Sequence, residues 1–521
     1  MANKNLFQTV KGIFTPKATA VNEAGGTAYE MTPKHALAQY AATGTLNKTF
    51  YADAGEQLEK VLAFCEGVEP EFIAKTAVFA RERGYMKDMP ALLCAVLSVK
   101  DREMLERVFP RVIDNGKMLR NFVQIMRSGA VGRKSLGTAP KRLVREWFEK
   151  RKPETIFKQS IGQTPSLADV LKMVHPKPAS PEHEALFGYL IGRDYKIELL
   201  PDAAKMFELF KVGLSMEVPD VPFQMLTALP LSENDWKAIA RNAGWTMTRM
   251  NLNTFQRNGV FKDAEMVRLI AERLRDKAAI KRARVFPYQL LAAYRMTESN
   301  SEMPRQITEA LQDAMETAIE NVPEIEGKVY VFPDVSGSML SPVTGHRKGS
   351  TTAVRCIDVA ALVSAAILRK NPSAEIVPFE QRVVKLNLNP RDSVMTNAAK
   401  LAKVGGGGTN CSAPLRELNK RKASGDLLIY VSDNESWVDS NRGWNNGTAT
   451  MQQFNEFKTR NPQAKLVCID IQPYATTQAL ERADILNIGG FSDNVFEIIS
   501  QFSEGSLGAQ HWVGVIEKVE F

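Results

Sequence analysis

Apolar side chains recur at helical spacing through residues 30–323, where almost no stretch alternates apolar and polar positions as a half-buried strand would. Proline and glycine interrupt the pattern at short intervals, so we expect helices of about ten to twenty residues, paired over roughly forty. No repeat in residue identity is visible, and the period alone predicts an irregular α-solenoid of the HEAT type. The clearest apolar stripes are Ile307/Leu311/Met315/Ile319, Val267/Ile270/Leu274 and Leu143/Val144/Trp147/Phe148.

The last third of the chain instead alternates short apolar runs with helical periods. Residues 329–333, 374–379, 427–431 and 465–471 are expected to form buried strands, and residues 356–368 a helix. Strands that alternate with helices are typical of a parallel, doubly wound sheet. The predicted organisation is therefore mainly α over residues 1–325, followed by an α/β domain over residues 326–521.

Oxygen-bearing side chains follow the strands of this predicted sheet. Asp334-Val-Ser-Gly-Ser comes after the first strand, Asp433 ends a later one, and a run of four glycines, 405–408, leads into Thr409. The carboxyl ends of parallel strands meet at one edge, and a hard divalent cation such as Mg²⁺ prefers oxygen ligands. The predicted metal ligands are Asp334, Ser336, Ser338, Thr409 and Asp433. Their alternative is a set of ordinary turn residues.

This set resembles the metal-ion-dependent adhesion site (MIDAS) of von Willebrand factor A (vWA) domains, in the same order along the chain. In that family the hydroxyls bind the ion, the aspartates help to position it, and one coordination place stays open for an acidic group on a partner. Enzyme motifs are missing: no Gly-Lys-Ser/Thr follows the glycines, and no Gly-x-Ser-x-Gly, His-Glu-x-x-His or Cys-x-x-Cys occurs. We therefore expect binding rather than catalysis, with a metal-dependent hydrolase ranked last.

Positive charge is concentrated in one segment. Residues 117–152 hold eleven Lys/Arg against two acidic residues, Glu146 and Glu149, whereas the whole chain has a net charge of +8. Such a surface attracts polyanions, although a solvated helix face would look the same in sequence. Arg142 and Arg145 share one face of a predicted helix, while Trp147 lies in its apolar stripe and is expected to be core rather than a base-stacking platform.

Length and composition narrow the class further. A chain of 521 residues with 44% hydrophobic and 24% charged residues is expected to be globular with more than one core. No apolar run is long enough to span a bilayer, and the first residues lack a signal-peptide core. Five scattered cysteines suit a reducing compartment, so a cytoplasmic location without membrane partners is expected.

The first 300 residues also resemble TROVE-module proteins of the Ro autoantigen family, including its bacterial orthologues. The resemblance rests on Asn22-Glu-Ala-Gly-Gly-Thr-Ala-Tyr29, Gly44-Thr-Leu-Asn-Lys-Thr-Phe-Tyr51, Arg81-Glu-Arg-Gly-Tyr-Met-Lys-Asp-Met-Pro90, Gly132-Arg-Lys-Ser-Leu-Gly137, His175-Pro-Lys-Pro178, Asn251-Leu-Asn-Thr-Phe255 and Arg284-Val-Phe-Pro287. It implies a monomeric ring of HEAT-type repeats whose two ends are closed by the vWA domain. It also implies a ribonucleoprotein that is not an enzyme.

In that family, small noncoding Y RNAs bind the basic outer surface, and 3′ ends of misfolded or single-stranded RNA enter the central hole. Some bacterial members tether the exoribonuclease polynucleotide phosphorylase, and the family acts in RNA quality control. The resemblance assigns RNA contact to His175 and Lys177, and to Lys158 upstream; a family arginine is replaced near Gly162. With the dense charge of the basic segment, the candidate RNA-binding residues are Arg133, Lys134, Lys141, Arg142, Arg145, Lys158, His175 and Lys177.

Two features of the sequence allow more than one interpretation. A protein-interaction scaffold that grips a partner's carboxylate through the MIDAS is the alternative to an RNA-binding ring. In the segment 340–350 beside the predicted metal site, Arg347 and Lys348 contact either an anion or solvent.

Overall fold

The computed structural model describes residues 15–521 with gaps at 163, 284–286, 299, 321, 346–353, 438–446, 491–492 and 508–510. Its residues group into two compact units. The first, called here the sheet unit, comprises residues 1–68, 280–295 and 311–519; the second, the helical unit, comprises residues 69–279, 296–310 and 520–521. None of the described helices is both long enough and apolar enough to cross a membrane.

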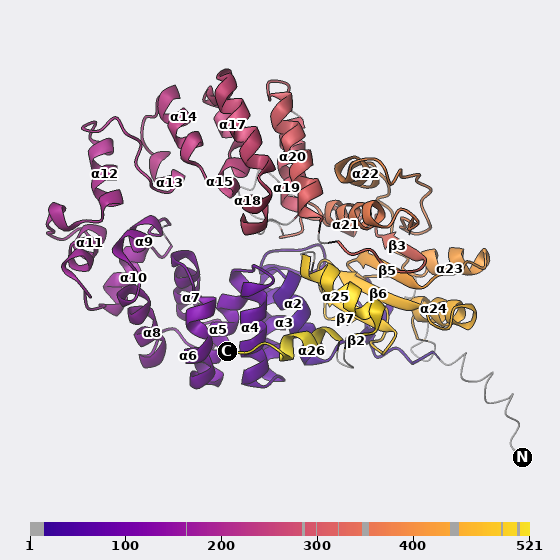
Figure 1. Ribbon diagram of the computed structural model, residues 1–521. Coiled ribbons are helices and arrows are strands. Elements are labelled where there is room, and N and C mark those ends of the chain that lie inside the picture. Colours follow the sequence, from indigo (N-terminus) through magenta and orange to yellow (C-terminus); the bar gives the residue numbers. More distant parts are fainter. Residues whose placement is uncertain are drawn as a thin grey trace, which may run out of the picture. The chain divides into compact units, whose positions relative to one another are not determined.

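The helical unit is built from short helices that pack mainly on near neighbours along the chain, for example α4 on α5, α5 on α6 and α7, and α10 on α7, α8 and α11 (Figure 1). This pattern of near-neighbour packing is that of a solenoid, as predicted. The elements are α4 (Pro70–Glu82), α5 (Asp88–Lys100), α6 (Arg102–Val112), α7 (Gly116–Ser128), α8 (Thr138–Glu149), α9 (Pro153–Lys158), α10 (Leu167–Val174), α11 (Pro181–Ile191), η1 (Ile197–Leu199), α12 (Asp202–Lys211), α13 (Phe223–Leu226), α14 (Glu233–Asn242), α15 (Trp245–Met250), α16 (Leu252–Arg257), η2 (Val260–Lys262) and α17 (Ala264–Arg275).

Three helices contribute residues to both units: α18 (Lys277–Ala283), α19 (Pro287–Glu298) and α20 (Arg305–Ala318). The predicted stripes on α8, α17 and α20 are buried. Trp147 is only 3% exposed and its indole N–H donates to the Ile113 carbonyl at 3.0 Å, which confirms its place in the core.

The sheet unit centres on five parallel strands in the order β4-β3-β5-β6-β8. Helices cover both faces: Tyr330, Phe332, Leu428 and Tyr430 join one apolar cluster with α23 and α24, while α21 packs on β3 and β5. The predicted doubly wound sheet is confirmed. The elements are β3 (Val329–Pro333), η3 (Ser338–Leu340), α21 (Cys356–Lys370), β4 (Glu375–Ile376), α22 (Val394–Leu401), α23 (Ala413–Lys420), β5 (Leu427–Ser432), α24 (Ala449–Arg460), β6 (Lys465–Asp470), β8 (Ile485–Gly489), α25 (Asp493–Glu504) and α26 (His511–Glu517).

The N-terminal residues also belong to the sheet unit. β1 (Ala20–Val21) and β2 (Thr27–Glu30) form an antiparallel pair, and β2 adds to β7 (Thr476–Thr477); α2 (Pro33–Thr43) and α3 (Ala54–Glu66) follow. Helical periodicity does not reveal this grouping, because strand pairs of two to four residues carry almost no pattern. Packing units and sequence domains need not coincide, so the division into 1–325 and 326–521 stays a prediction.

Candidate functional site

Three separate segments meet at the carboxyl edge of the parallel sheet. Asp334 N–H donates to the Val431 carbonyl at 3.0 Å, Gly406 N–H to Val335 at 2.8 Å, and Gly337 N–H to Gly407 at 2.8 Å. Among the parallel strands, β3 comes first in the chain. The next strand, β4, lies on one side of β3, and β5 lies on the other, so the direction in which strands are added reverses between β3 and β5. Ligands of open α/β sheets bind at such a switch point.

The predicted ligand residues are gathered and buried there. Asp334 and Ser336 are 0% exposed, and Thr409, Asp433 and Ser338 only 3–5%. The hydroxyl oxygens of Ser336 and Ser338 lie 3.3 Å apart. Neighbouring ligands of an octahedral Mg²⁺ lie about 3 Å apart, which follows from metal–oxygen distances of about 2.1 Å. The spacing of the two hydroxyls therefore suits adjacent coordination places.

The backbone of the glycine run, residues 405–408, passes so close to neighbouring groups that side chains would not fit at most of its positions. Gly405 has a φ of +90°, and a Cβ there would collide with the Val335 carbonyl. A Cβ at Gly408 would meet the indole of Trp437. Only glycine allows this backbone to carry Thr409 so close to the Asp334 loop.

The two aspartates lack a positive charge beside them among the described residues. Burial raises the pKa of Asp334, and burial together with the nearby charge of Asp334 raises the pKa of Asp433 to about 7. Asp334 is held by the Ser336 N–H at 2.8 Å and by the Ser432 hydroxyl at 2.6 Å. A divalent cation would offset the repulsion of two such buried carboxylates.

The donor chemistry therefore fits a hard divalent cation. Within the described residues no group of three or more His, Cys, Asp or Glu side chains is arranged to hold a metal. The predicted set needs none, because it joins two carboxylates to three hydroxyls, which favours Mg²⁺ over the softer metals that His and Cys attract. The metal itself stays a prediction.

Sequence reasoning missed several neighbours of these ligands. Tyr51 comes from the N-terminal segment; its phenol lies near Ser338 and Asp433, and its ring packs edge-on against Tyr474, with 5.3 Å between centroids. The Trp437 side chain is 43% exposed, and the backbone N–H of this residue donates to the Thr409 carbonyl at 3.3 Å. Nothing in the spacing of the sequence points to Tyr51, because it is almost three hundred residues from the Asp334 loop.

Glu435 is a further buried carboxylate near the predicted ligands. It is 0% exposed, and burial, with the charge of Asp433, raises its pKa. One of its oxygens accepts from the Glu23 N–H at 2.7 Å and the other from the Thr476 hydroxyl at 3.5 Å. Glu435 therefore fastens the N-terminal β-pair to the sheet, a structural role that uses both oxygens.

The predicted RNA-binding residues all lie in the helical unit, and their partners divide them into three groups. Arg142 is ion-paired with Glu106 at 2.5 Å and Glu146 at 2.7 Å, and Lys158 with Asp220 at 2.7 Å and Glu154 at 3.1 Å. A cation that already holds carboxylates offers little free charge to a phosphate.

Two of the predicted arginines hydrogen-bond to the backbone. Arg133 donates to the Ser98 carbonyl at 3.0 Å, and Arg145 donates to the Val174 carbonyl. The second bond places Arg145 next to His175, the residue that follows the end of α10. His175 is exposed and has a φ of +51°.

The third group is free in the part of the chain that the structure describes. The side chains of Lys134, Lys141, His175 and Lys177 form no ion pair or hydrogen bond among these residues; the backbone N–H of Lys177 donates to the Glu149 carboxylate at 3.2 Å. Lys134, His175 and Lys177 are exposed and Lys141 is half-buried. Their assignment to RNA stays a prediction.

α7 presents a further basic face that the predicted set left out. Lys117, Arg120, Gln124 and Arg127 are spaced three, four and three residues apart and so share one side of the helix, opposite the buried Phe122. None of the four has an ion pair or side-chain hydrogen bond within the described residues. Helical spacing within the basic segment was the signal that could have found them.

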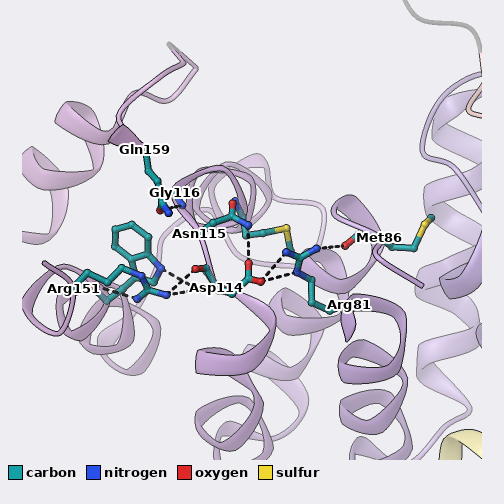
Figure 2. A network of polar contacts seen from close by, with 10 residues as sticks. Arg81, Met86, Asp114, Asn115, Gly116, Arg151 and Gln159 are labelled. Atoms are coloured by element: carbon teal, nitrogen blue, oxygen red, sulfur yellow. Dashed lines mark hydrogen bonds and ion pairs between the residues drawn. The ribbon is translucent and has the colours of Figure 1, made fainter. Parts of the chain in front are cut away.

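A hydrogen-bonded turn before α7 fixes the direction of this face (Figure 2). Asp114 accepts from the Arg81 guanidinium at 2.7 and 3.2 Å, and its carbonyl accepts from Arg151 at 3.0 Å. Gly116 N–H donates to the Gln159 side chain at 2.8 Å, and Asn115 caps the helix by accepting from the Met118 N–H at 3.0 Å. The start of α7 is thus tied to α4, to Arg151 beyond the end of α8 and to the residue after α9.

The resemblance implies an arginine near Gly162, where this chain has none in the sequence. The guanidinium of Arg120 lies where a side chain at Gly162 would stand, and Gly162 has a φ of +112°. A positive charge is therefore present at this place, supplied by α7. Arg347 and Lys348 lie outside the described residues.

Comparison with known proteins gives two domain matches. A model described as the Ro60 vWA domain matches residues 328–503, and a TROVE domain model matches residues 166–299. Over 97% of this chain and all of the relative, the sequence is 24% identical to a protein of Deinococcus radiodurans named RNA-binding protein RO60. A Caenorhabditis elegans protein of the same name is also 24% identical, over 47% of this chain and 38% of its own length.

A solved structure agrees on the fold. The crystal structure of the Deinococcus radiodurans RO (RSR) protein matches 91% of this chain and 100% of its own, with a TM-score of 0.62 and 21% identity. The chain is thus similar, over nearly its whole length, to a protein that shares its fold.

Proposed function

Since the chain belongs to the Ro family, whose members combine a TROVE module with a vWA domain, we propose that it binds RNA through its helical unit. The observation that carries the proposal is the set of cations on α7, α8 and the end of α10 that have no ion pair within the described residues. The chain is also related, over 97% of its length, to a protein named for RNA binding. Counterion release from phosphates is the driving force that such a surface supplies.

The finer proposal names the RNA. We propose that a small, structured noncoding RNA of the Y type binds the exposed basic surface, and that unpaired 3′ ends of misfolded RNA enter the hole of a ring. A-form helices hide their bases in a deep groove, so shape, single strands and ends are what the protein recognises. The protein acts in RNA quality control in the cytoplasm, as a monomer and without catalysis of its own, and an exoribonuclease such as polynucleotide phosphorylase joins it through the RNA.

The vWA site gives the second proposed activity. A Mg²⁺ ion bound by Ser336, Ser338 and Thr409, with Asp334 and Asp433 positioning it, would supply a Lewis-acidic coordination place for a partner's carboxylate. Its support is the buried pair of aspartates, which a cation would neutralise. Were this the only activity, the protein would be an interaction scaffold rather than an RNA-binding protein.

A salt titration tests the RNA proposal. We expect the full-length protein to bind a small structured RNA with a single-stranded 3′ extension, and the logarithm of the association constant to fall linearly with the logarithm of salt concentration. Neutralising about six phosphates would lower the affinity by about 10³ between 50 and 200 mM salt. Gel shifts that show no RNA binding at 50 mM salt would reject the proposal and leave the scaffold.

A further inference from the structure

A cavity of about 540 Å³ lies in the helical unit between the C-terminal half of α7, α10 and the loop that leads into α10. This volume is within the range of about 300–1,000 Å³ that is usual for small-molecule sites. Its polar lining is exposed and therefore open to solvent. The lining side chains used below are Gln124, Arg127, Thr164, Asp169, Lys172 and Met173.

Two cations, Arg127 and Lys172, face this cavity together with the Asp169 carboxylate. The pKa of Asp169 is lowered by its hydrogen bonds from Ser166 and further by the charges of Lys172 and Arg127. Arg127 and Lys172 are exposed and form no ion pair in the described part of the chain, although the cations nearby on α8 and α9, such as Arg142 and Lys158, are ion-paired. They come from two different helices that pack together. An arginine fork and a lysine ammonium converging from separate elements suit a phosphate group.

Asp169 supplies the opposite chemistry in the same cavity. One of its carboxylate oxygens accepts from the Ser166 N–H at 2.9 Å and the Ser166 hydroxyl at 2.7 Å, in the capping box of α10. Its other oxygen has no hydrogen-bond donor within the described residues, and the amide of Gln124 likewise has no partner there. These groups can accept from and donate to the edge of a heterocycle.

The remaining lining is apolar. Pro165 and Met173 are half-buried and contribute surface against which a flat ring can pack. An inorganic anion would satisfy the two cations but would leave the carboxylate and the apolar wall unused. A ligand that uses all three kinds of lining carries a phosphate, a flat ring and an N–H donor.

We propose that this cavity binds one unpaired nucleotide of the bound RNA, extruded from its strand, with its phosphate on Arg127 and Lys172 and its base edge on Asp169. The inference rests on the proposed RNA binding and adds a base preference to it. An acceptor-only carboxylate favours bases with an exocyclic amino group, because the single N–H on the pairing edge of uracil is flanked by two carbonyl oxygens that a carboxylate repels; adenine, cytosine or guanine is therefore preferred over uracil. Unstacking is cheapest where the nucleotide is already unpaired, as in a loop, a bulge or a 3′ extension.

The experiment uses the full-length protein and fluorescent ten-nucleotide single strands of A, C or U. The wild-type protein is expected to bind the A and C strands about 10-fold more tightly than the U strand. Arg127→Ala and Lys172→Ala are each expected to weaken all three strands about 10-fold, because they remove a phosphate contact. Asp169→Asn is expected to remove the preference against U, since an amide offers both a donor and an acceptor.

The control is Arg142→Ala, which removes one positive charge from a neighbouring helix where the arginine is already ion-paired. If the three cavity variants bind as tightly as this control and keep the base preference, the cavity proposal is wrong, while the proposed RNA binding is unaffected. Equal competition by inorganic phosphate and by AMP would assign the cavity to an anion rather than a nucleotide. A wild-type protein that binds neither single strands nor the structured RNA would instead reject the proposed function itself.

Discussion

Replacing Lys117, Arg127 and Lys134 together by alanine is expected to weaken binding of a structured RNA about 1,000-fold at 0.1 M salt. Each of these exposed cations is free of ion pairs in the described chain and can neutralise a phosphate. Loss of one phosphate contact costs roughly 10-fold at this salt concentration and lowers the slope of the salt dependence by about 1. Gel shifts or fluorescence anisotropy over 50–200 mM salt would measure both quantities.

A second triple variant, with Arg142, Lys150 and Lys158 replaced by alanine, is the matched control. It removes the same net charge, but each of these cations is ion-paired. Arg142 and Lys150 pair with Glu146, and Lys158 pairs with Asp220 and Glu154. We expect it to cost less than about 10-fold in affinity, because exposed ion pairs contribute little and their cations are not free. Equal losses in the two triple variants would show that net charge, and not the free cations, determines binding.

Addition of Mg²⁺ is expected to stabilise the folded protein, and Asp334→Asn is expected to abolish that effect. A ligand at 100 times its Kd stabilises the folded state by about 2.7 kcal/mol, which is a rise of several degrees in the melting temperature of a domain of this size. Thermal unfolding with and without Mg²⁺ measures it. Asp392→Asn changes a surface carboxylate that pairs with Lys400 at 2.7 Å and should keep the full effect.

The effect of Mg²⁺ should grow with pH. The folded-state pKa of Asp433 is raised from its ordinary value to about 7, so the folded protein binds a proton more readily than the unfolded chain does, and stability is lost as pH rises from about 4 through 7. Mg²⁺ competes with that proton, so its stabilisation should be small at pH 5 and large at pH 8. Equal stabilisation of wild type and Asp334→Asn at pH 8 would place the ion elsewhere.

Most of the fold could be predicted from the sequence, because hydrophobic periodicity is a local signal. Alternation of strands with helices was enough to predict a doubly wound sheet, and the Asp334 and Asp433 positions follow from where its strands end. Helical spacing likewise identified the stripe that contains the buried Trp147. These features depend on residues within one or two turns of each other.

Features that depend on long-range contacts were not predictable. Tyr51 reaches the predicted metal site, and the N-terminal strand β2 pairs with β7, yet neither has a local pattern. Charge density along the sequence singled out Arg142 together with Lys134, and the family resemblance added Lys158, but Arg142 and Lys158 meet carboxylates on other elements. Tertiary neighbours decide which cation is left without an ion pair. They also decide that Arg127 and Lys172, from two helices, line one cavity.

If this chain binds RNA, the ultraviolet spectrum of the protein purified at low salt will show it without any added ligand. The absorbance at 260 nm is expected to lie well above that of protein alone. The co-purifying nucleic acid, once sequenced, is expected to be dominated by one small RNA and to be released at high salt. Protein that purifies free of nucleic acid at low salt, and that does not shift RNA in gels, would show that the chain does not bind RNA.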